Sequence, residues 1–204
     1  MRNFVVIGQK ATASSDFLLD DLPGTSGRLD VLLRCVRAAT LVSHGLRRDV
    51  VVYLILGGGA RAPRVLRLAG ADARFIRPDE RSLATLVKKV LACDADRAAT
   101  GFVEVKAGIA LCSGGIEAVL ADVGAAALYV LEEGARDVRD EPDLGRGDAA
   151  FFIGDPLGFD ADTRARLEAA RARPLGVGPV SLHAEDTVTI VSNELDRRRM
   201  GEGG

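Results

Sequence analysis

Short, continuously apolar runs alternate with amphipathic segments along the chain, and this alternation predicts strands and helices in turn. Residues 2–8, 49–59 and 64–70 are mostly apolar, as expected of buried strands. Apolar side chains recur at helical spacing in residues 28–44 and 77–92. The second of these segments also has acidic residues in its first turn and lysines near its end, which suits the helix dipole. The first half of the chain therefore predicts three strands and two helices.

The second half continues the alternation after a stretch of weaker pattern that begins near residue 93. The elements expected there are a short helix over 114–123, a strand over 126–134, a strand and turn over 148–158, a helix from about 160 to 172, and a last helix that begins at residue 183. No internal repeat or low-complexity linker interrupts the series. The pattern predicts a single α/β domain over residues 1–204, with a mostly parallel sheet and flanking helices.

Composition narrows the class of protein. The chain is 48% apolar, 4% aromatic and free of tryptophan, so we expect an aliphatic core. Three scattered cysteines and two distant histidines argue against a disulfide scaffold and against a metal centre. The apolar run at the N-terminus is too short for a signal peptide, and no run reaches membrane-spanning length. We therefore expect a cytoplasmic protein with no metal and no membrane partner.

Charge is unevenly distributed along the chain. Residues 1–102 hold 16 Lys and Arg against 10 Asp and Glu, a net charge of +6. The remaining residues hold 11 against 19, a net charge of −8, and the two halves sum to −2. A basic front half is compatible with a polyanionic partner and equally with a solvated arginine-rich surface.

One glycine-rich segment resembles a dinucleotide-binding motif. Residues 57–62, GGGARA, follow a strand and match G-x-G-x-x-A, with Asp79 at about the expected distance beyond them. Such a motif must open a helix, whereas Pro63 and a further apolar run follow here. We interpret these glycines as a hairpin or turn. The sequence also has no G-x-S-x-G elbow and no Walker-type phosphate loop.

Three segments near the C-terminus share one design. YVLEEG at 129–134, FFIGDPLG at 151–158, and LGVGPVSLHAEDTVTIVSNELD at 175–196 each combine a strand with a glycine-bearing loop. In a parallel sheet the ends of such strands share one edge, so the three loops can converge on one crevice. The alternative is three unrelated turns. If the three loops do converge, we expect them to bind a nucleotide-like ligand largely through backbone groups.

Longer segments carry a resemblance to a known family. They are SSDFLLDDLPGTSGRLDVLLRCV, SHGLRRDVVVYLIL, RPDERSLATLVKKVL, and the second and third of the C-terminal segments above. In order and over nearly the whole chain, they resemble the archaeal tRNA (pseudouridine-54-N1)-methyltransferase family of the SPOUT superfamily. The resemblance implies an α/β fold with a C-terminal trefoil knot, an exception to the rule that chains do not thread their loops.

The resemblance further implies an S-adenosylmethionine-dependent methyltransferase that acts on N1 of pseudouridine 54 in the T loop of tRNA. Residues 1–110 would form the substrate side and residues 111–204 the knot and cofactor site, with a homodimer formed through the knot region. The methyl donor would contact Leu131, Gly154, Val177, Gly178, Leu182 and Thr187. Where the family typically reads HANHC, this chain reads HAEDT, so Asp186 and Thr187 replace a histidine and a cysteine.

Candidates for proton transfer and for RNA binding follow from the same resemblance. Asp30 and His183 are candidate catalytic groups, because a carboxylate or a neutral imidazole can accept the proton of N1. Asp30 can equally pair with an arginine, and His183 can equally cap its helix. The candidate RNA-binding residues are Arg28, Arg34, Arg47, Arg48 and Arg81. For the last three, ion pairs with Asp49, Asp79 or Glu80 are the alternative.

Two other functions stay open on the sequence alone. The altered HAEDT stretch is compatible with methylation of another acceptor, such as rRNA or a free C-nucleoside. A catalytically silent RNA-binding relative that keeps the fold is the second alternative.

Overall fold

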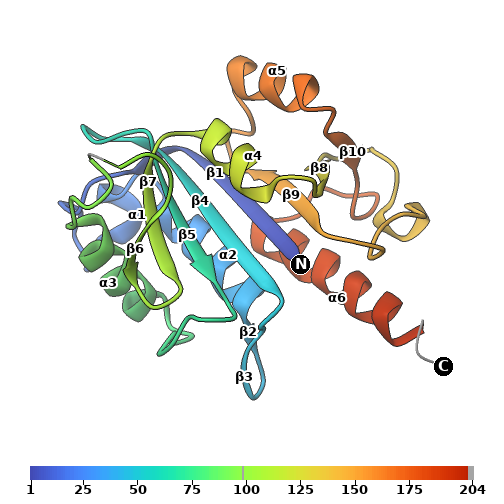
Figure 1. Cartoon of the computed structure of the whole chain (residues 1–204), viewed down its shortest axis with the longest axis horizontal. Helices are drawn as coiled ribbons and strands as arrows, with labels where there is room; N and C mark the ends of the chain where they lie inside the picture. Colours follow the sequence, from blue (N-terminus) through green and yellow to red (C-terminus); the bar gives the residue numbers. More distant parts are fainter. Residues whose placement is uncertain (98, 202–204) are drawn as a thin grey trace.

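A computed structural model describes residues 1–97 and 99–201, which form an eight-stranded sheet flanked by helices (Figure 1). The strands of this sheet are β1 (Arg2–Thr12), β4 (Val50–Gly58), β5 (Arg64–Ala69), β6 (Val103–Lys106), β7 (Ile109–Ser113), β8 (Ala127–Leu131), β9 (Ala149–Gly154) and β10 (Arg173–Leu175). The helices are α1 (Leu22–Thr25), α2 (Leu29–Thr40), α3 (Glu80–Leu91), α4 (Ile116–Val123), α5 (Ala161–Ala169) and α6 (Ala184–Gly201), with a 3-10 turn η1 (Val138–Asp140).

The strands lie in the order β10-β8-β9-β1-β4-β5-β7-β6. The segment from β10 to β4 is parallel throughout, and β1 at its centre pairs with β9 on one side and β4 on the other. The β5, β7 and β6 strands extend the sheet in antiparallel fashion. The prediction of a mostly parallel α/β sheet is therefore confirmed, with an antiparallel edge that the pattern did not distinguish.

Two apolar layers enclose the central strand. Phe4 and Val6 of β1 face a cluster formed with α2, α3 and α6, whereas Val5 and Ile7 face a second cluster that includes side chains of α4 and α5. This alternation is what a strand covered on both faces requires, because successive side chains point to opposite sides. The run of apolar residues at positions 4–7 is continuous because both faces of β1 are buried.

The last helix packs against α2 and is tied to the first strand. Val188, Val191 and Leu195 of α6 are buried in the core. The guanidinium of the buried Arg2 donates hydrogen bonds to the Asp49 carboxylate and to the Ser192 carbonyl oxygen of α6. The N-terminus of the sheet and the C-terminal helix are thereby held together, and they lie side by side in Figure 1.

The helix predicted over 28–44 ends earlier than expected. The chain leaves α2 after Thr40 and forms a small antiparallel hairpin, β2 (Leu41–Val42) and β3 (Gly45–Leu46), which projects from one end of the molecule (Figure 1). The amide of Arg47 donates to the Thr40 carbonyl oxygen at 2.8 Å and closes this hairpin. The expectation that the helix continues to His44 was wrong. The backbone groups of residues 41–46 pair with each other in the hairpin instead of continuing the helix.

Two further boundaries differ from the predictions. The first strand continues past residue 8 to Thr12, and the weakly patterned stretch after residue 93 contains β6 and β7. β7 is short, and such a run cannot be assigned by periodicity alone. The glycine-rich segment that mimics a dinucleotide motif does form the hairpin connection between the antiparallel strands β4 and β5. Of the helices in the described part of the chain, none has the length and apolar character that crossing a membrane requires.

A buried ion pair fixes the start of β5. Arg64 Nη2 lies 2.7 Å from Asp96 Oδ1, and both side chains are at most 2% exposed. The same guanidinium donates to the carbonyl oxygens of Ala13, Leu91 and Cys93. It therefore joins the loop after β1 to the end of α3.

We expect Asp96→Ala to lower the free energy of unfolding by about 3–5 kcal/mol, because it leaves the Arg64 charge buried without a counter-ion. Urea denaturation measures this loss. Asp20→Ala is the control, since it removes an exposed partner of Arg81 and exposed pairs contribute little. Equal effects of the two substitutions would contradict this assignment.

Candidate functional site

The three glycine-bearing loops of the C-terminal half meet around one cavity of about 840 Å³. The loops follow β8, β9 and β10, whose parallel arrangement brings their carboxyl ends to one edge of the sheet. All six residues expected to contact the methyl donor line this cavity: Leu131, Gly154, Val177, Gly178, Leu182 and Thr187. The structure thus brings together residues that are up to 56 positions apart, from 131 to 187.

Asp155 holds the loop after β9 in place. Its carboxylate oxygens accept hydrogen bonds from the amides of Gln9 at 2.9 Å and Leu157 at 2.8 Å. Gly154, directly before it, passes so close to the returning chain that a Cβ atom there would lie 2.8 Å from the carbonyl carbon of Gly158. Glycine is therefore required for this turn, and the wall of the cavity here is backbone.

The loop after β10 is fixed by backbone pairing. The amide of Gly176 donates to the Arg136 carbonyl oxygen at 2.7 Å, and the amide of Val138 donates to the Gly176 carbonyl oxygen at 2.7 Å. Gly178 then has a φ of 145°, a conformation that favours glycine, and Pro179 follows it. The chain is thus led past the loop after β8 and across the cavity before α6 begins.

The start of α6 forms one wall of the cavity. The carbonyl oxygen of His183 accepts hydrogen bonds from the amides of Asp186 and Thr187, at 3.1 and 3.0 Å. The Thr187 hydroxyl donates to the same oxygen at 3.2 Å. The His183 side chain lies exposed at the cavity, whereas Asp186 lies outside the cavity lining. The first turn is therefore rigid while the imidazole remains accessible.

A cluster of opposite charges lies where α2 meets α6. The Asp30 carboxylate, 3% exposed, accepts hydrogen bonds from Arg28 Nε and Arg34 Nη1, both at 3.0 Å. Burial opposes its ionisation, but the hydrogen bonds and charges of the two arginines outweigh burial and hold the pKa of Asp30 below its usual value. Arg28 and Arg34 line the cavity, whereas Asp30 lies behind them.

Glu185 joins this cluster from α6. Its Oε1 atom accepts from Arg34 Nε at 2.8 Å, whereas its Oε2 atom is buried and has no hydrogen-bond partner among the described residues. Glu185 lines the cavity and also an adjoining groove of about 850 Å³ between α2, the β2–β3 hairpin and α6. From the sequence, Glu185 could be recognised only as an acidic residue in the first turn of a helix. Its pairing with Arg34, 151 residues away, depends on the tertiary fold.

The remaining candidate RNA-binding arginines lie away from the cavity. Arg47 lines the adjoining groove and donates to Asp196 at 2.8 Å. Arg48 donates to the carbonyl oxygens of Gly70 and Ala71. These contacts replace the predicted alternative partners, because Asp49 instead pairs with Arg2 and Arg199.

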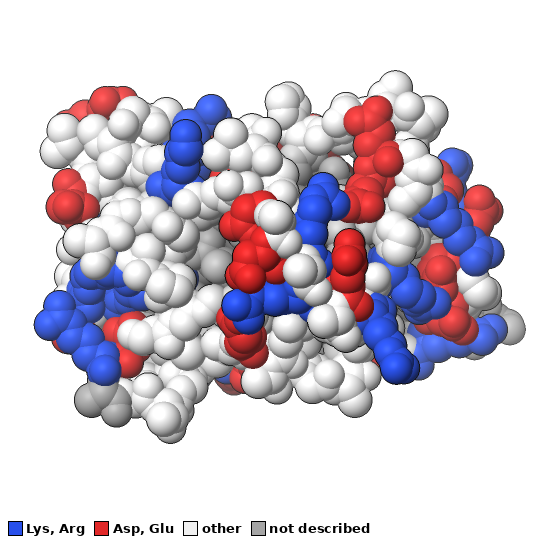
Figure 2. Space-filling view, turned by 90° about the horizontal axis from the view of Figure 1, so that it is seen from above, with Lys and Arg blue, Asp and Glu red and all other residues white. Residues whose placement is uncertain are grey.

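Arg81 also has a different partner from those expected. It pairs with Asp20 at 2.6 Å, while Asp79 caps α3 and Glu80 faces Arg34. On the face of the molecule in Figure 2, basic and acidic side chains are intermingled. Most arginines in the front half of the chain are therefore paired with carboxylates within the protein.

The chemistry of the cavity suits an amphipathic organic ligand. Apolar side chains such as Leu131, Ile153 and Leu175 line it together with backbone groups of the three loops and the carboxylates of Glu132 and Glu133. Its volume lies in the range of small-molecule sites. Among the described residues, no group of three or more His, Cys, Asp or Glu side chains could hold a metal ion.

Comparisons with known proteins agree with this picture. Residues 1–200 match the model of a family described as "Putative SAM-dependent RNA methyltransferase". A tRNA (pseudouridine(54)-N(1))-methyltransferase of Methanococcoides burtonii is 36% identical over 99% of both chains, and one of Halobacterium salinarum is 40% identical over 96% of both. The crystal structure of Archaeoglobus fulgidus Nep1 bound to S-adenosylhomocysteine is 15% identical and has a TM-score of 0.67, covering 98% of this chain and 99% of that one.

We expect Asp155→Ala to loosen the loop after β9, because the amides of Gln9 and Leu157 lose their acceptor. Each lost partner leaves a polar group unpaired, at a cost of about 1–3 kcal/mol. Hydrogen exchange should show faster exchange at these two amides. Asp160→Ala is the control, since it removes the cap of α5 alone. Unchanged protection of Gln9 in the Asp155 variant would rule out this role.

Proposed function

Because the chain belongs to the tRNA (pseudouridine(54)-N(1))-methyltransferase family, we propose that it transfers a methyl group from S-adenosylmethionine to N1 of pseudouridine 54 in the T loop of tRNA. Similarity to such enzymes over nearly the full length of both chains is the observation that carries this conclusion. The convergence of three loops on one cavity supports it from the structure. The proposed substrate also implies a cytoplasmic protein.

The residues of the cavity fit the methyl donor. Bound S-adenosylmethionine supplies a methyl group on a positively charged sulfonium, where a nucleophile can attack it. Backbone groups around Leu131, Gly154 and Val177 can hold an adenine, as expected where glycine loops leave the main chain open. The Glu185 carboxylate, which pairs with Arg34, also lines the cavity. Gly178, Leu182 and Thr187 complete the proposed contacts.

His183 is the proposed proton acceptor. Methylation of N1 forms an N–C bond and requires that N1 lose its proton, so a basic group must lie beside the donor. The imidazole of His183 lines the cavity, and the first turn of α6 fixes its backbone. Asp30 is less suited to accept this proton, because two arginines occupy its carboxylate and lower its pKa. We assign Asp30 to positioning Arg28 and Arg34 at the cavity.

The replacement of the family's usual cysteine by Thr187 is compatible with this function. The Thr187 hydroxyl bonds to the His183 carbonyl oxygen and so remains directed toward the start of the helix. Asp186 is exposed and lies outside the cavity lining, so its negative charge is not placed against the donor. The HAEDT stretch therefore keeps the geometry of the last loop.

We also propose that residues 176–183 pass through a loop formed by residues 132–148, as a trefoil knot requires. The support is the two-sided backbone pairing of Gly176 with Arg136 and Val138. We infer a single domain, with the donor site in residues 111–204 and the substrate side in residues 1–110. The exposed apolar side chains of Leu157, Val180 and Leu182 beside the cavity suit a homodimer formed through this region.

The direct test is methyl transfer from labelled S-adenosylmethionine to T-loop RNAs that carry pseudouridine or uridine at the target position. We expect transfer to the pseudouridine RNA alone, because uridine presents no N1 proton. Donor binding without transfer to either RNA would point to a different acceptor or to a silent relative. Absence of donor binding would contradict the assignment of the cavity.

We expect His183→Ala to lower kcat by about 100-fold, the contribution typical of a positioned general base, with donor affinity unchanged. His44→Ala is the matched control, since His44 lies exposed at the tip of the β2–β3 hairpin. Single-turnover methyl transfer at saturating RNA measures the effect. If the two variants are equally active, the acceptor is a different group, and Glu185→Gln is the next variant to assay.

A further inference from the structure

Phe75 stands out on the surface of the molecule. Its side chain is 88% exposed, and no other aromatic side chain among the described residues is exposed. Its backbone has a φ of 60°, a conformation that bulky residues rarely adopt. The exposed ring gains little from the core, and strained backbone of this kind is concentrated at functional sites.

Four cations lie near Phe75, three of them in the same hollow and the fourth next to it in the chain. Arg74, Arg77, Lys89 and Lys106 are exposed, and none of them forms an ion pair with another described residue. With Phe75 they form what we call the Phe75 surface. A hollow of about 390 Å³ is lined by Phe75, Arg77, Lys89 and Lys106 with neutral side chains, and no carboxylate lines it.

This surface differs from the arginines that the sequence favoured for RNA binding. Arg28, Arg34, Arg47 and Arg81 each contact a carboxylate of the protein. Their charges are thus largely compensated before any ligand arrives. The charges of the Phe75 surface are available to a polyanion, and a phosphate backbone gains most of its affinity from such cations.

The chain segment of the Phe75 surface also borders the groove next to the cavity. Arg34 and Glu185 line both the cavity and the groove between α2, the β2–β3 hairpin and α6. Pro78, which directly follows Arg77 of the Phe75 surface in the chain, also lines that groove. The groove also holds the unpartnered hydroxyl of Ser192, a side chain that is 3% exposed.

We propose that the Phe75 surface binds a second part of the tRNA, outside the methylated nucleotide, with an unpaired base stacked on Phe75 and phosphates held by Arg77, Lys89 and Lys106. This inference rests on the proposed function. An exposed aromatic ring flanked by free cations is the arrangement by which proteins hold single-stranded RNA, because every base has a face that can stack. The surface positions the RNA and takes no part in methyl transfer.

The experiment measures the affinity of the full chain for unmodified tRNA and, separately, the kinetics of methyl transfer. We expect Phe75→Ala to weaken tRNA binding about tenfold, the effect typical of losing one stacked base, and to raise KM without lowering kcat. Phe75→Trp should restore both values. Lys89→Ala combined with Lys106→Ala should reduce the slope of log Kd against log salt by about one to two.

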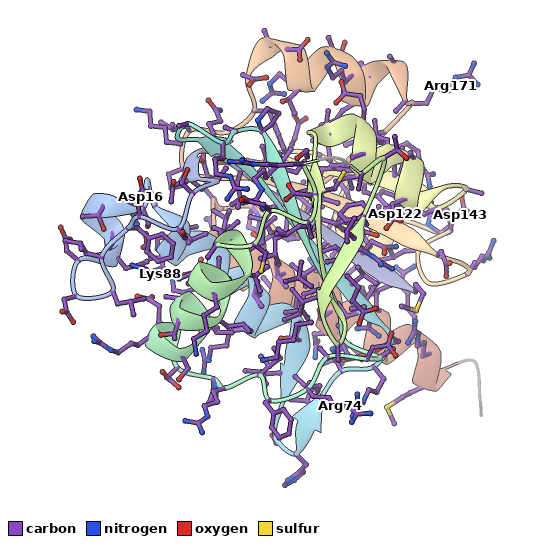
Figure 3. The ribbon with its side chains drawn as sticks, turned by 60° about the vertical axis from the view of Figure 1, so that its left-hand side comes forward. Asp16, Arg74, Lys88, Asp122, Asp143 and Arg171 are labelled. Atoms are coloured by element: carbon purple, nitrogen blue, oxygen red, sulfur yellow. The ribbon has the colours of Figure 1, made fainter. Side chains whose placement is uncertain are left out.

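Arg171→Ala is the matched control. Arg171 also has a positive φ and forms no ion pair with another described residue, and it lies at the opposite end of the molecule from Arg74 (Figure 3). It should leave tRNA affinity unchanged. Equal tRNA affinities of the Phe75→Ala and Arg171→Ala proteins would overturn the inference. A changed oligomeric state of the Phe75→Ala protein, with tRNA affinity intact, would overturn it in favour of a protein contact.

The two proposals fail in different ways. Failure of the proposed function is seen in the wild-type protein, as an absence of methyl transfer to pseudouridine-containing tRNA. The inference about Phe75 is decided by the binding of tRNA to the variants, which needs no turnover. A wild-type protein that binds no tRNA would overturn both.

Discussion

The backbone pairing of Gly176 with Arg136 and Val138 is the constraint on which the site depends. It holds the chain after β10 against the loop after β8, so that the next residues must cross the cavity before a helix can start. The place where α6 begins follows from this, and with it the positions of His183 and Thr187. Because α6 then packs on α2, Glu185 meets Arg34, and the charged cluster at the cavity forms. Backbone hydrogen bonds thus fix the course of the chain around the cavity, and the side chains take their positions from it.

Electrostatics divides the arginines into two groups with different consequences. Those near the cavity are held by carboxylates, which fixes their side chains at the expense of their attraction for phosphate. Those around Phe75 form no ion pair with another described residue, which leaves them able to release counter-ions from RNA. The near-neutral net charge of −2 therefore conceals a local surplus of positive charge. A count of basic residues in each half of the chain cannot reveal it, because pairing depends on residues far apart in sequence.

The elements that could be predicted from the sequence are those defined by a pattern within their own residues. The doubly buried run of β1 and β4, the amphipathic α3 and the glycine loops after β8, β9 and β10 all follow from periodicity and turn chemistry. Elements that depend on contacts with residues far away in the sequence could not be predicted. The β2–β3 hairpin interrupts a helical pattern, and β7 is defined by its neighbours β5 and β6. The engagement of Asp30 by two arginines and the outward direction of Phe75 are likewise tertiary facts.

The central position of β1 has a consequence for biosynthesis. This strand is made before the other strands of the sheet, yet one of its edges is completed by β9, about 150 residues later, and its first arginine is secured by Ser192 of α6. While the chain is being made, an apolar strand with an unpaired edge is therefore exposed for most of the time of translation. A product truncated before β9 would therefore keep this edge of β1 without its partner strand.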